Sequence, residues 1–214
     1  MELTPLMVQL AGKNVVIVGG GRIAERRIQK LLGSGANLHV ITPTLTDGLR
    51  SLCGKGLFIW QNKHFEPEDS KEAFLVIVAT NDSMVNKTVV QSCASNTLVN
   101  VASEASEGNV QFPAHFKQGR LSISIATNGA SPLLSGKIKR QLQIMYDKNY
   151  GEYVDFLYEC RQIIKHSMFD EYEQKCILKD LLSDDYQNKM KQEQALNLLK
   201  SYSREGWKNE RIGG

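Results

Sequence analysis

The chain has 214 residues, of which 42% are hydrophobic and 23% are charged, and its formal net charge is +3. This composition is that of an ordinary globular protein, and it excludes the collagen-like, disordered and coiled-coil classes. The small net charge argues against nucleic acid as a partner. No stretch approaches the roughly 20 apolar residues that cross a bilayer, which argues against a membrane partner.

The cysteines and the N-terminus predict a cellular compartment. The first residues lack the basic and apolar regions of a signal peptide. None of the four cysteines stands at the spacing of a zinc site; they are Cys53, Cys93, Cys160 and Cys176. Both observations predict free thiols in the cytoplasm and no metal site. The basic excess lies in residues 1–146, where it suits an anionic small molecule or belongs to a solvated mixed surface.

The first half of the chain alternates between short apolar runs and helical stretches. Expected strands cover residues 14–18, 37–42, 57–60, 74–79 and 98–101, and expected helices cover residues 23–32 and 83–95. Parallel strands need a crossover segment of about this length between them. The pattern therefore predicts an α/β fold with a doubly wound parallel sheet.

The pattern changes after residue 113. Residues 119–127 alternate strictly between apolar and polar types, which predicts a strand with one apolar face. Helical spacing starts at Pro132, and after Gly151 we expect a set of short helices and no strand. The histidines are isolated from one another, and we expect His115 in a loop.

Residues 19–24 read Gly-Gly-Gly-Arg-Ile-Ala and stand where the first strand ends and a helix begins. Gly19 permits a tight turn, Gly21 lets the backbone approach a pyrophosphate, and Ala24 allows close contact between helix and strand. Arg22 and Ile23 open the helix, whose free N–H groups attract an anion. Arg22 either faces a phosphate or is solvated. The context favours dinucleotide binding over a merely tight turn.

Two further strand ends carry polar residues. In dinucleotide-binding folds an acidic residue after the second strand grips a ribose hydroxyl, but here that strand ends in Thr42 and a proline. Thr42 can still bond a ribose, and the absence of a basic cluster after it favours NAD over NADP. The fourth strand ends in Thr80, Asn81 and Asp82, where ligands bind in open α/β sheets. These residues also suit the N-cap of the next helix.

The fifth strand and a later turn complete the candidate site. Asn100 and Ser103 follow or end the fifth strand, and they either touch a substrate near the nicotinamide or form an ordinary turn. The later turn holds Thr127, Asn128, Gly129 and Ser131, before the helix that opens at Pro132. Ser131 can cap that helix, and the helix start offers an anion site. His115 is the histidine closest to these residues.

These motifs, taken in order, resemble the precorrin-2 dehydrogenase and siroheme synthase family. The resemblance rests on residues 18–27, on residues 79–82 with Asn86, on Asn100 and Val101, on residues 112–114 and on residues 123–132. The family oxidises precorrin-2 to sirohydrochlorin with NAD, and its substrate is an octacarboxylate tetrapyrrole. The resemblance implies a Rossmann domain (1–113), a central α+β dimerisation segment (114–150) and a small C-terminal helical domain (151–214), assembled as a homodimer.

The resemblance also assigns roles to residues. Asn100, Ser103 and Ser124 are the candidates for catalytic contacts. The candidates for substrate binding are His115, Thr127, Asn128, Gly129 and Ser131.

One position departs from the family pattern. Bifunctional members, which also insert iron, carry an aspartate where this chain has Ser103. A hydroxyl cannot accept a proton near neutral pH as a carboxylate can. The departure favours a dehydrogenase without chelatase activity and leaves the proton acceptor open. A bifunctional enzyme and a non-catalytic NAD-sensing module remain alternatives, although no DNA-binding segment accompanies the glycine motif.

Overall fold

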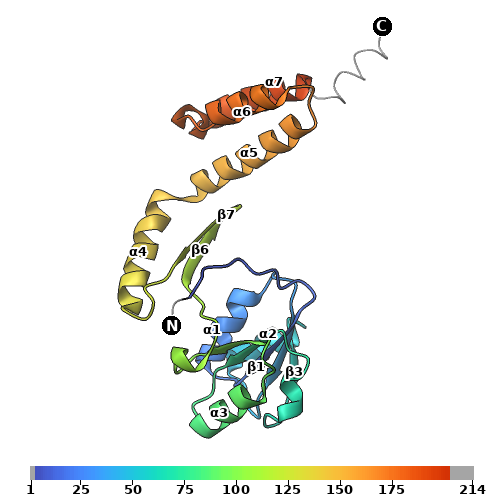
Figure 1. Ribbon diagram of the computed structural model, residues 1–214, viewed down its shortest axis with the longest axis vertical. Coiled ribbons are helices and arrows are strands. Elements are labelled where there is room, and N and C mark those ends of the chain that lie inside the picture. The colour runs from blue at the N-terminus through green and yellow to red at the C-terminus, as the bar shows by residue number, and fades with distance from the viewer. Residues whose placement is uncertain (1–2, 203–214) are drawn as a thin grey trace, which may run out of the picture. The chain divides into compact units, whose positions relative to one another are not determined.

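The computed structural model describes residues 3–202, and the chain divides into two compact units between Phe112 and Pro113 (Figure 1). The strands of the first unit are β1 (Asn14–Val18), β2 (Asn37–Ile41), β3 (Ile59–Gln61), β4 (Leu75–Val78) and β5 (Leu98–Val101). Its α-helices are α1 (Arg22–Leu31), α2 (Asp47–Gly54) and α3 (Ser83–Ser92), and short 3₁₀ helices cover Pro67–Ser70 and Ala105–Glu107. The predicted strands and helices are present: β1 and β5 have the expected bounds, and the ends of the other elements differ by one to three residues.

The five strands form one parallel sheet in the order β3-β2-β1-β4-β5. Val18 at the end of β1 lies opposite Ile41 in β2 and Val78 in β4, and Val78 lies opposite Val101 in β5. The carboxyl ends of these strands therefore lie in line at one edge. The strand order reverses between β1 and β4, which is where open α/β sheets bind their ligands. The predicted Rossmann sheet is confirmed.

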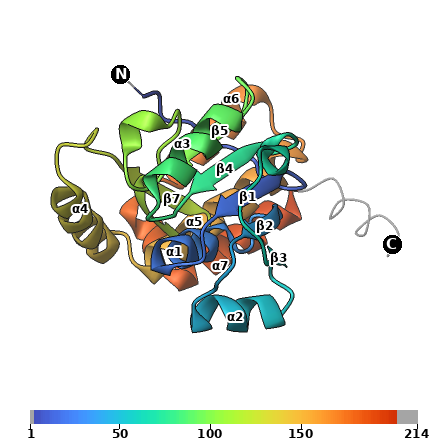
Figure 2. The same cartoon turned by 90° about the horizontal axis from the view of Figure 1, so that it is seen from below.

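The two faces of the sheet are covered by different helices (Figure 2). Helix α1 buries Ala24, Ile28 and Leu31, which recur at helical spacing and so form one apolar stripe against the sheet. Helix α2 joins this layer through Leu49. Helix α3 packs on the opposite face through Val89. Since both faces are covered, the central strands β1 and β4 are nearly continuous buried apolar runs without polar alternation.

Helix α2 is a correction to the sequence prediction, which placed no helix between β2 and β3. Only Leu49 is fully buried among its eight residues, so the apolar stripe is too short to give a periodic pattern. The helix begins because the Thr46 hydroxyl accepts a hydrogen bond from the Leu49 N–H at 3.3 Å. A threonine at this position is a typical N-cap residue and could have predicted the start of the helix.

The second unit begins with a hairpin of β6 (Ala114–Gln118) and β7 (Leu121–Ile125). Its helices are α4 (Pro132–Met145), α5 (Lys148–Lys165), α6 (Glu171–Asp180) and α7 (Lys189–Ser201), with a 3₁₀ helix at Asp184–Gln187. Strand β7 and helix α4 were predicted. Strand β6 was not, and His115, expected in a loop, lies within β6 opposite Ser124. The apolar residues of β6, Ala114 and Phe116, are too few to have predicted a strand.

Helix α5 corrects the expectation of short helices beginning after Gly151. It has 18 residues and passes through Gly151 without a break. A Cβ at Gly151 would lie 2.8 Å from the carbonyl carbon of Gln118, so the glycine lets the helix lie directly against the end of β6. Gly151 is thus a packing contact inside α5.

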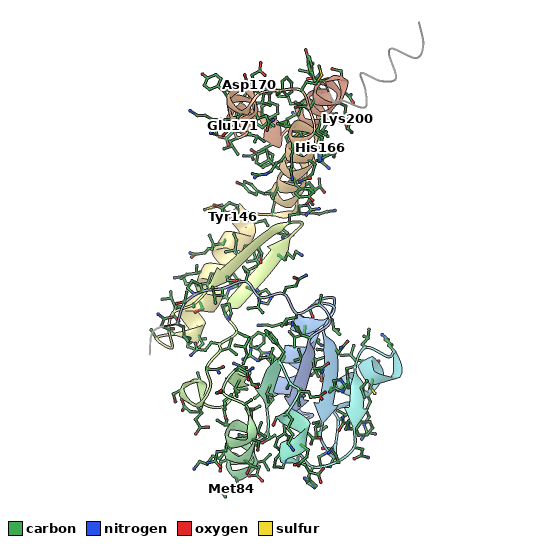
Figure 3. All side chains as sticks on the ribbon, turned by 45° about the vertical axis from the view of Figure 1, so that its right-hand side comes forward. Met84, Tyr146, His166, Asp170, Glu171 and Lys200 are labelled. Carbon is green, nitrogen blue, oxygen red and sulfur yellow. The ribbon has the colours of Figure 1, made fainter. Side chains whose placement is uncertain are left out.

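The helical end of the second unit has its own apolar core. Tyr153, Phe156 and Cys160 on α5 pack with Leu181 and Leu199 from the following segments. Side chains cap the starts of the helices; Asp170, for example, forms a reciprocal capping box at the start of α6 (Figure 3). Within residues 3–202 no helix is both long and apolar enough to span a membrane.

Candidate functional site

A cleft of about 730 Å³ lies at the carboxyl edge of the parallel sheet. Its wall is built from the segments that follow the strands and from the first turn of α1. These lining segments are residues 18–23, 41–46, 63–65 and 79–82, with Val85. The volume and the position at the switch point suit a small-molecule or cofactor site.

The fold needs a glycine at the first two of the three consecutive glycines but not at the third. Gly19 has φ +117°, and a Cβ there would overlap the carbonyl oxygen of Ala79, so β1 and β4 could not approach. A Cβ on Gly20 would overlap the carbonyl oxygen of Thr44. Gly21 has φ −87°, and a Cβ there would meet nothing within 4 Å. The fold therefore does not need a glycine at 21, and the open space beside it is available to a ligand.

Helix α1 begins at this open space with its backbone donors exposed. Gly21 is its N-cap and offers no side-chain hydrogen bond, whereas side chains cap α2 and α3. The free N–H groups and the positive end of the helix dipole face the cleft, a combination that binds phosphate groups. Ala24 is fully buried, which allows α1 to lie close to the sheet. Arg22 and Ile23 line the cleft beside the turn.

The segment after β2 forms a second wall. The Thr42 hydroxyl, predicted to meet a ribose, donates to the Thr44 carbonyl at 2.9 Å and retains only acceptor capacity toward a ligand. The segment is fixed to the glycine turn because the Thr46 N–H donates to the Gly20 carbonyl at 3.0 Å. The Thr46 hydroxyl also donates to the Glu25 carboxylate at 2.6 Å.

Lys63 and His64 also line the cleft, and neither was predicted as a site residue. Lys63 is engaged by the carboxylates of Glu66 and Asp69, each at 2.8 Å. These hydrogen bonds, that of Asp69 foremost, raise the pKa of Lys63. Because two carboxylates already surround this ammonium, it is a poor partner for a 2′-phosphate. This part of the cleft therefore favours NAD over NADP as the bound cofactor.

The turn after β4 lines the cleft from the other side. Asp82 caps α3 by accepting the N–H groups of Met84 at 2.8 Å and Val85 at 3.2 Å, as predicted. Thr80 and Asn81, in the same turn, also line the cleft. The Thr80 hydroxyl donates to the Asn86 side chain at 2.6 Å. The turn is thus anchored to α3 by two side chains.

The candidates after β5 differ from one another. Asn100 is buried within the strand and donates to the Val110 carbonyl at 2.9 Å, while its Oδ1 has no partner within the described residues. Ser103 is exposed, and its Oγ accepts from the Asn86 amide at 3.4 Å. The Glu104 carboxylate accepts from the Ser106 hydroxyl and N–H, which lowers the pKa of Glu104 and makes it a weak base.

The remaining candidates lie in the second unit. The Thr127 hydroxyl contacts the backbone of Ser131, and Ser131 caps α4 by accepting the Leu134 N–H at 3.1 Å, so the predicted cap is confirmed. Asn128 and Gly129 have positive φ angles of 47° and 84° and form the turn itself.

His115 and Ser124 are directly opposite each other on β6 and β7, so their side chains share one face of the hairpin. No group of three or more potential metal ligands occurs within residues 3–202.

Comparison with known proteins places the chain in a family. An NAD(P)-binding family model matches residues 6–114, and the model of the SirC C-terminal domain matches residues 150–195. Precorrin-2 dehydrogenase of Priestia megaterium is 40% identical over 92% of this chain and 98% of its own length. The chain belongs to the precorrin-2 dehydrogenase family. Precorrin-2 dehydrogenase of Bacillus subtilis (strain 168) is 33% identical over 75% of this chain and 99% of its own length.

A solved structure extends the match to the whole fold. The structure described as SirC, precorrin-2 dehydrogenase, has a TM-score of 0.84 at 39% identity and covers 94% of this chain. The first unit also fits the cofactor of this family of oxidoreductases, NAD. Two features of the chain suit this cofactor: the space beside Gly21 is open, and the start of α1 has no side-chain cap.

Proposed function

We propose that this protein oxidises precorrin-2 to sirohydrochlorin, with NAD as the hydride acceptor. The observation that carries the proposal is the match to precorrin-2 dehydrogenases over almost the whole chain, in sequence and in fold. The cleft beside Gly21 supports it independently, because it combines an open glycine with free helix N–H groups. The net reaction transfers a hydride from the macrocycle to NAD and releases one proton.

The residues of the chain bind and orient the reactants. Bound NAD supplies the electron acceptor for the hydride. The glycine turn and the start of α1 hold the pyrophosphate, and the Thr80–Asp82 turn lies at the strand edge where the nicotinamide half must extend. Ser103 stands at the end of β5 on the same edge. Its hydroxyl donates or accepts a hydrogen bond but does not take up a proton at neutral pH.

The substrate side of the proposal rests on the second unit. His115, Ser124 and the Thr127–Ser131 turn are the proposed contacts to the tetrapyrrole. The start of α4 offers N–H groups to a carboxylate of this polyanionic substrate. The basic excess of residues 1–146 supports the same substrate class.

We also propose that the enzyme is a cytoplasmic homodimer, with residues 114–150 at the interface. Leu133 and Ile144 on α4 are 86% and 82% exposed. Large apolar side chains left this exposed mark an interaction surface, and a second copy would cover them. The unpaired edge of the β6–β7 hairpin supports the same arrangement. The free cysteines support the cytoplasmic assignment.

An anaerobic assay tests the proposed activity. The protein is incubated with precorrin-2 and NAD, and the absorption spectrum of sirohydrochlorin is followed. A parallel incubation supplies sirohydrochlorin and ferrous iron without NAD. The proposal predicts product in the first incubation and no metal insertion above the protein-free rate in the second. Metal insertion would show a bifunctional enzyme, and the absence of oxidation would refute the function.

A further inference from the structure

Asn86 is a buried polar residue in the middle of an apolar helix face. It is 5% exposed on α3, whose other buried residue is Val89. Asparagine is a weak helix former, and a buried amide costs free energy unless its hydrogen bonds are made. Neither helix propensity nor apolar packing therefore explains why an asparagine occupies this buried position. The hydrogen bonds of its side chain explain it.

The Asn86 amide connects the ends of two strands. Its Nδ2 donates to the Thr80 carbonyl at 3.3 Å and to the Ser103 Oγ at 3.4 Å, and its Oδ1 accepts from the Thr80 hydroxyl at 2.6 Å. The orientation of the amide is fixed, because the Thr80 carbonyl can only accept and must face the nitrogen. Asn86 thereby ties the turn after β4 to the residue after β5.

The directions of these bonds determine where the hydroxyl protons point. Thr80 donates its proton to Asn86 over the shorter contact, and its Oγ1 accepts the Asp82 N–H at 3.1 Å. Ser103 accepts an N–H from Asn86, so its own proton is not needed for that contact. Ser103 is exposed, and its O–H is therefore free to donate away from the protein interior.

We propose that Asn86 is a positioning residue that holds the Thr80–Asp82 turn in place and directs the Ser103 hydroxyl outward as a hydrogen-bond donor. The proposal rests on the proposed function, because the acceptor is an oxygen of the bound reactants. That oxygen is a carboxylate of the tetrapyrrole or the carboxamide of the nicotinamide. A hydrophobic residue at 86 could make none of these hydrogen bonds.

Four variants test the proposal. Asn86→Ala removes the clamp, which is the set of hydrogen bonds from Asn86 to Thr80 and Ser103. Ser103→Ala removes the hydroxyl donor, and the double variant combines the two changes. Gln91→Ala is the matched control, because Gln91 is an exposed amide on the same helix. The measurements are the NAD Kd without substrate, kcat and KM for precorrin-2, and the melting temperature. The NAD Kd of Ser103→Ala distinguishes the two possible acceptors. If the Ser103 hydroxyl donates to the nicotinamide carboxamide, this variant binds NAD more weakly; if it donates to a tetrapyrrole carboxylate, the NAD Kd is unchanged.

Asn86→Ala should raise the NAD Kd about three- to tenfold, because the turn that lines the cleft loses two hydrogen bonds. It should also lower kcat/KM for precorrin-2 at saturating NAD by about three- to tenfold. In the Ser103→Ala background this second loss should vanish, since the donor is already gone. Gln91→Ala should match the parent in every measurement.

Two results would overturn the proposal. One is an unchanged NAD Kd in Asn86→Ala, and the other is the same loss of kcat/KM with and without Ser103. If Asn86→Ala does not fold, Asn86→Asp replaces it, because it keeps the shape but makes Ser103 donate inward, and the same loss of kcat/KM is expected. A parent that does not oxidise precorrin-2 refutes the proposed function instead, while the NAD Kd still tests the clamp.

Discussion

Replacing Gly21 with aspartate should separate the stability of the fold from cofactor binding. The backbone at Gly21, with φ −87° and ψ −174°, suits any residue, and a Cβ would meet nothing within 4 Å. An aspartate there can also accept the free N–H groups at the start of α1, which no side chain caps in the parent. The variant should therefore fold at least as well as the parent.

The expected gain in stability is small. Replacing glycine at a compatible position contributes about 0.4–1 kcal/mol through the unfolded state. Aspartate is better than glycine as an N-cap by a few tenths of a kcal/mol. A total of about 1 kcal/mol raises the melting temperature by about 2–4 °C for a chain of this length.

The expected loss of binding is large. The new carboxylate takes up the N–H groups that would hold the pyrophosphate and repels its charge. Each charge-assisted hydrogen bond lost costs about 1.5–3 kcal/mol, so the NAD Kd should rise by at least about tenfold. The assay is thermal melting with and without NAD, because ligand at 100 times its Kd stabilises the folded state by about 2.7 kcal/mol.

A matched substitution at Gly19 completes the test. Gly19→Ala should lower the melting temperature without NAD, because φ is +117° there and the Cβ would overlap the Ala79 carbonyl. A Gly21→Asp protein that melts higher with NAD, by as much as the parent does, would refute the assignment of the cleft.

Three further predictions follow from other parts of the structure. Ser103→Ala should keep sirohydrochlorin formation within about tenfold of the parent, and a loss beyond about a hundredfold would show that Ser103 acts directly in the chemistry. Light scattering should give twice the 24.0 kDa chain mass, and the monomer mass would contradict the proposed dimer. Burial raises the pKa of the Cys160 thiol to about 12 from 9.0; the unfolded chain loses this proton first, so the free energy of unfolding should fall as pH rises above about 9. Urea unfolding at two alkaline pH values checks this, and Cys160→Ala should remove that part of the decline.

The parallel sheet could be predicted because β1 and β4 are nearly continuous apolar runs and the other strands are shorter apolar segments that alternate with helical stretches. The glycine turn was equally predictable, since the strand before it and the helix after it are both marked. Helix α2 and strand β6 were missed because each buries too few side chains to leave a periodic pattern. The contact of Gly151 with Gln118 could not be predicted, because it depends on a partner distant in sequence.

The candidate site shows the same limit. Thr80 and Ser103 could be placed at one sheet edge from strand order alone. The bond that joins them through Asn86 could not, because a buried amide inside a helix has no local signature. Lys63 was missed for a related reason: β3 is only three residues long, and the lysine follows it in a loop held by carboxylates.

The stoichiometry of the oxidation tests the central claim most directly. Under anaerobic conditions, with precorrin-2 limiting and NAD in excess, the absorbance of NADH and that of sirohydrochlorin are recorded together. We expect one NADH for each sirohydrochlorin formed, at rates proportional to enzyme, and a lower rate of both products with Gly21→Asp when NAD is held near the parent's Kd. Sirohydrochlorin formation without NADH, or equal rates for the parent and Gly21→Asp, would contradict the claim.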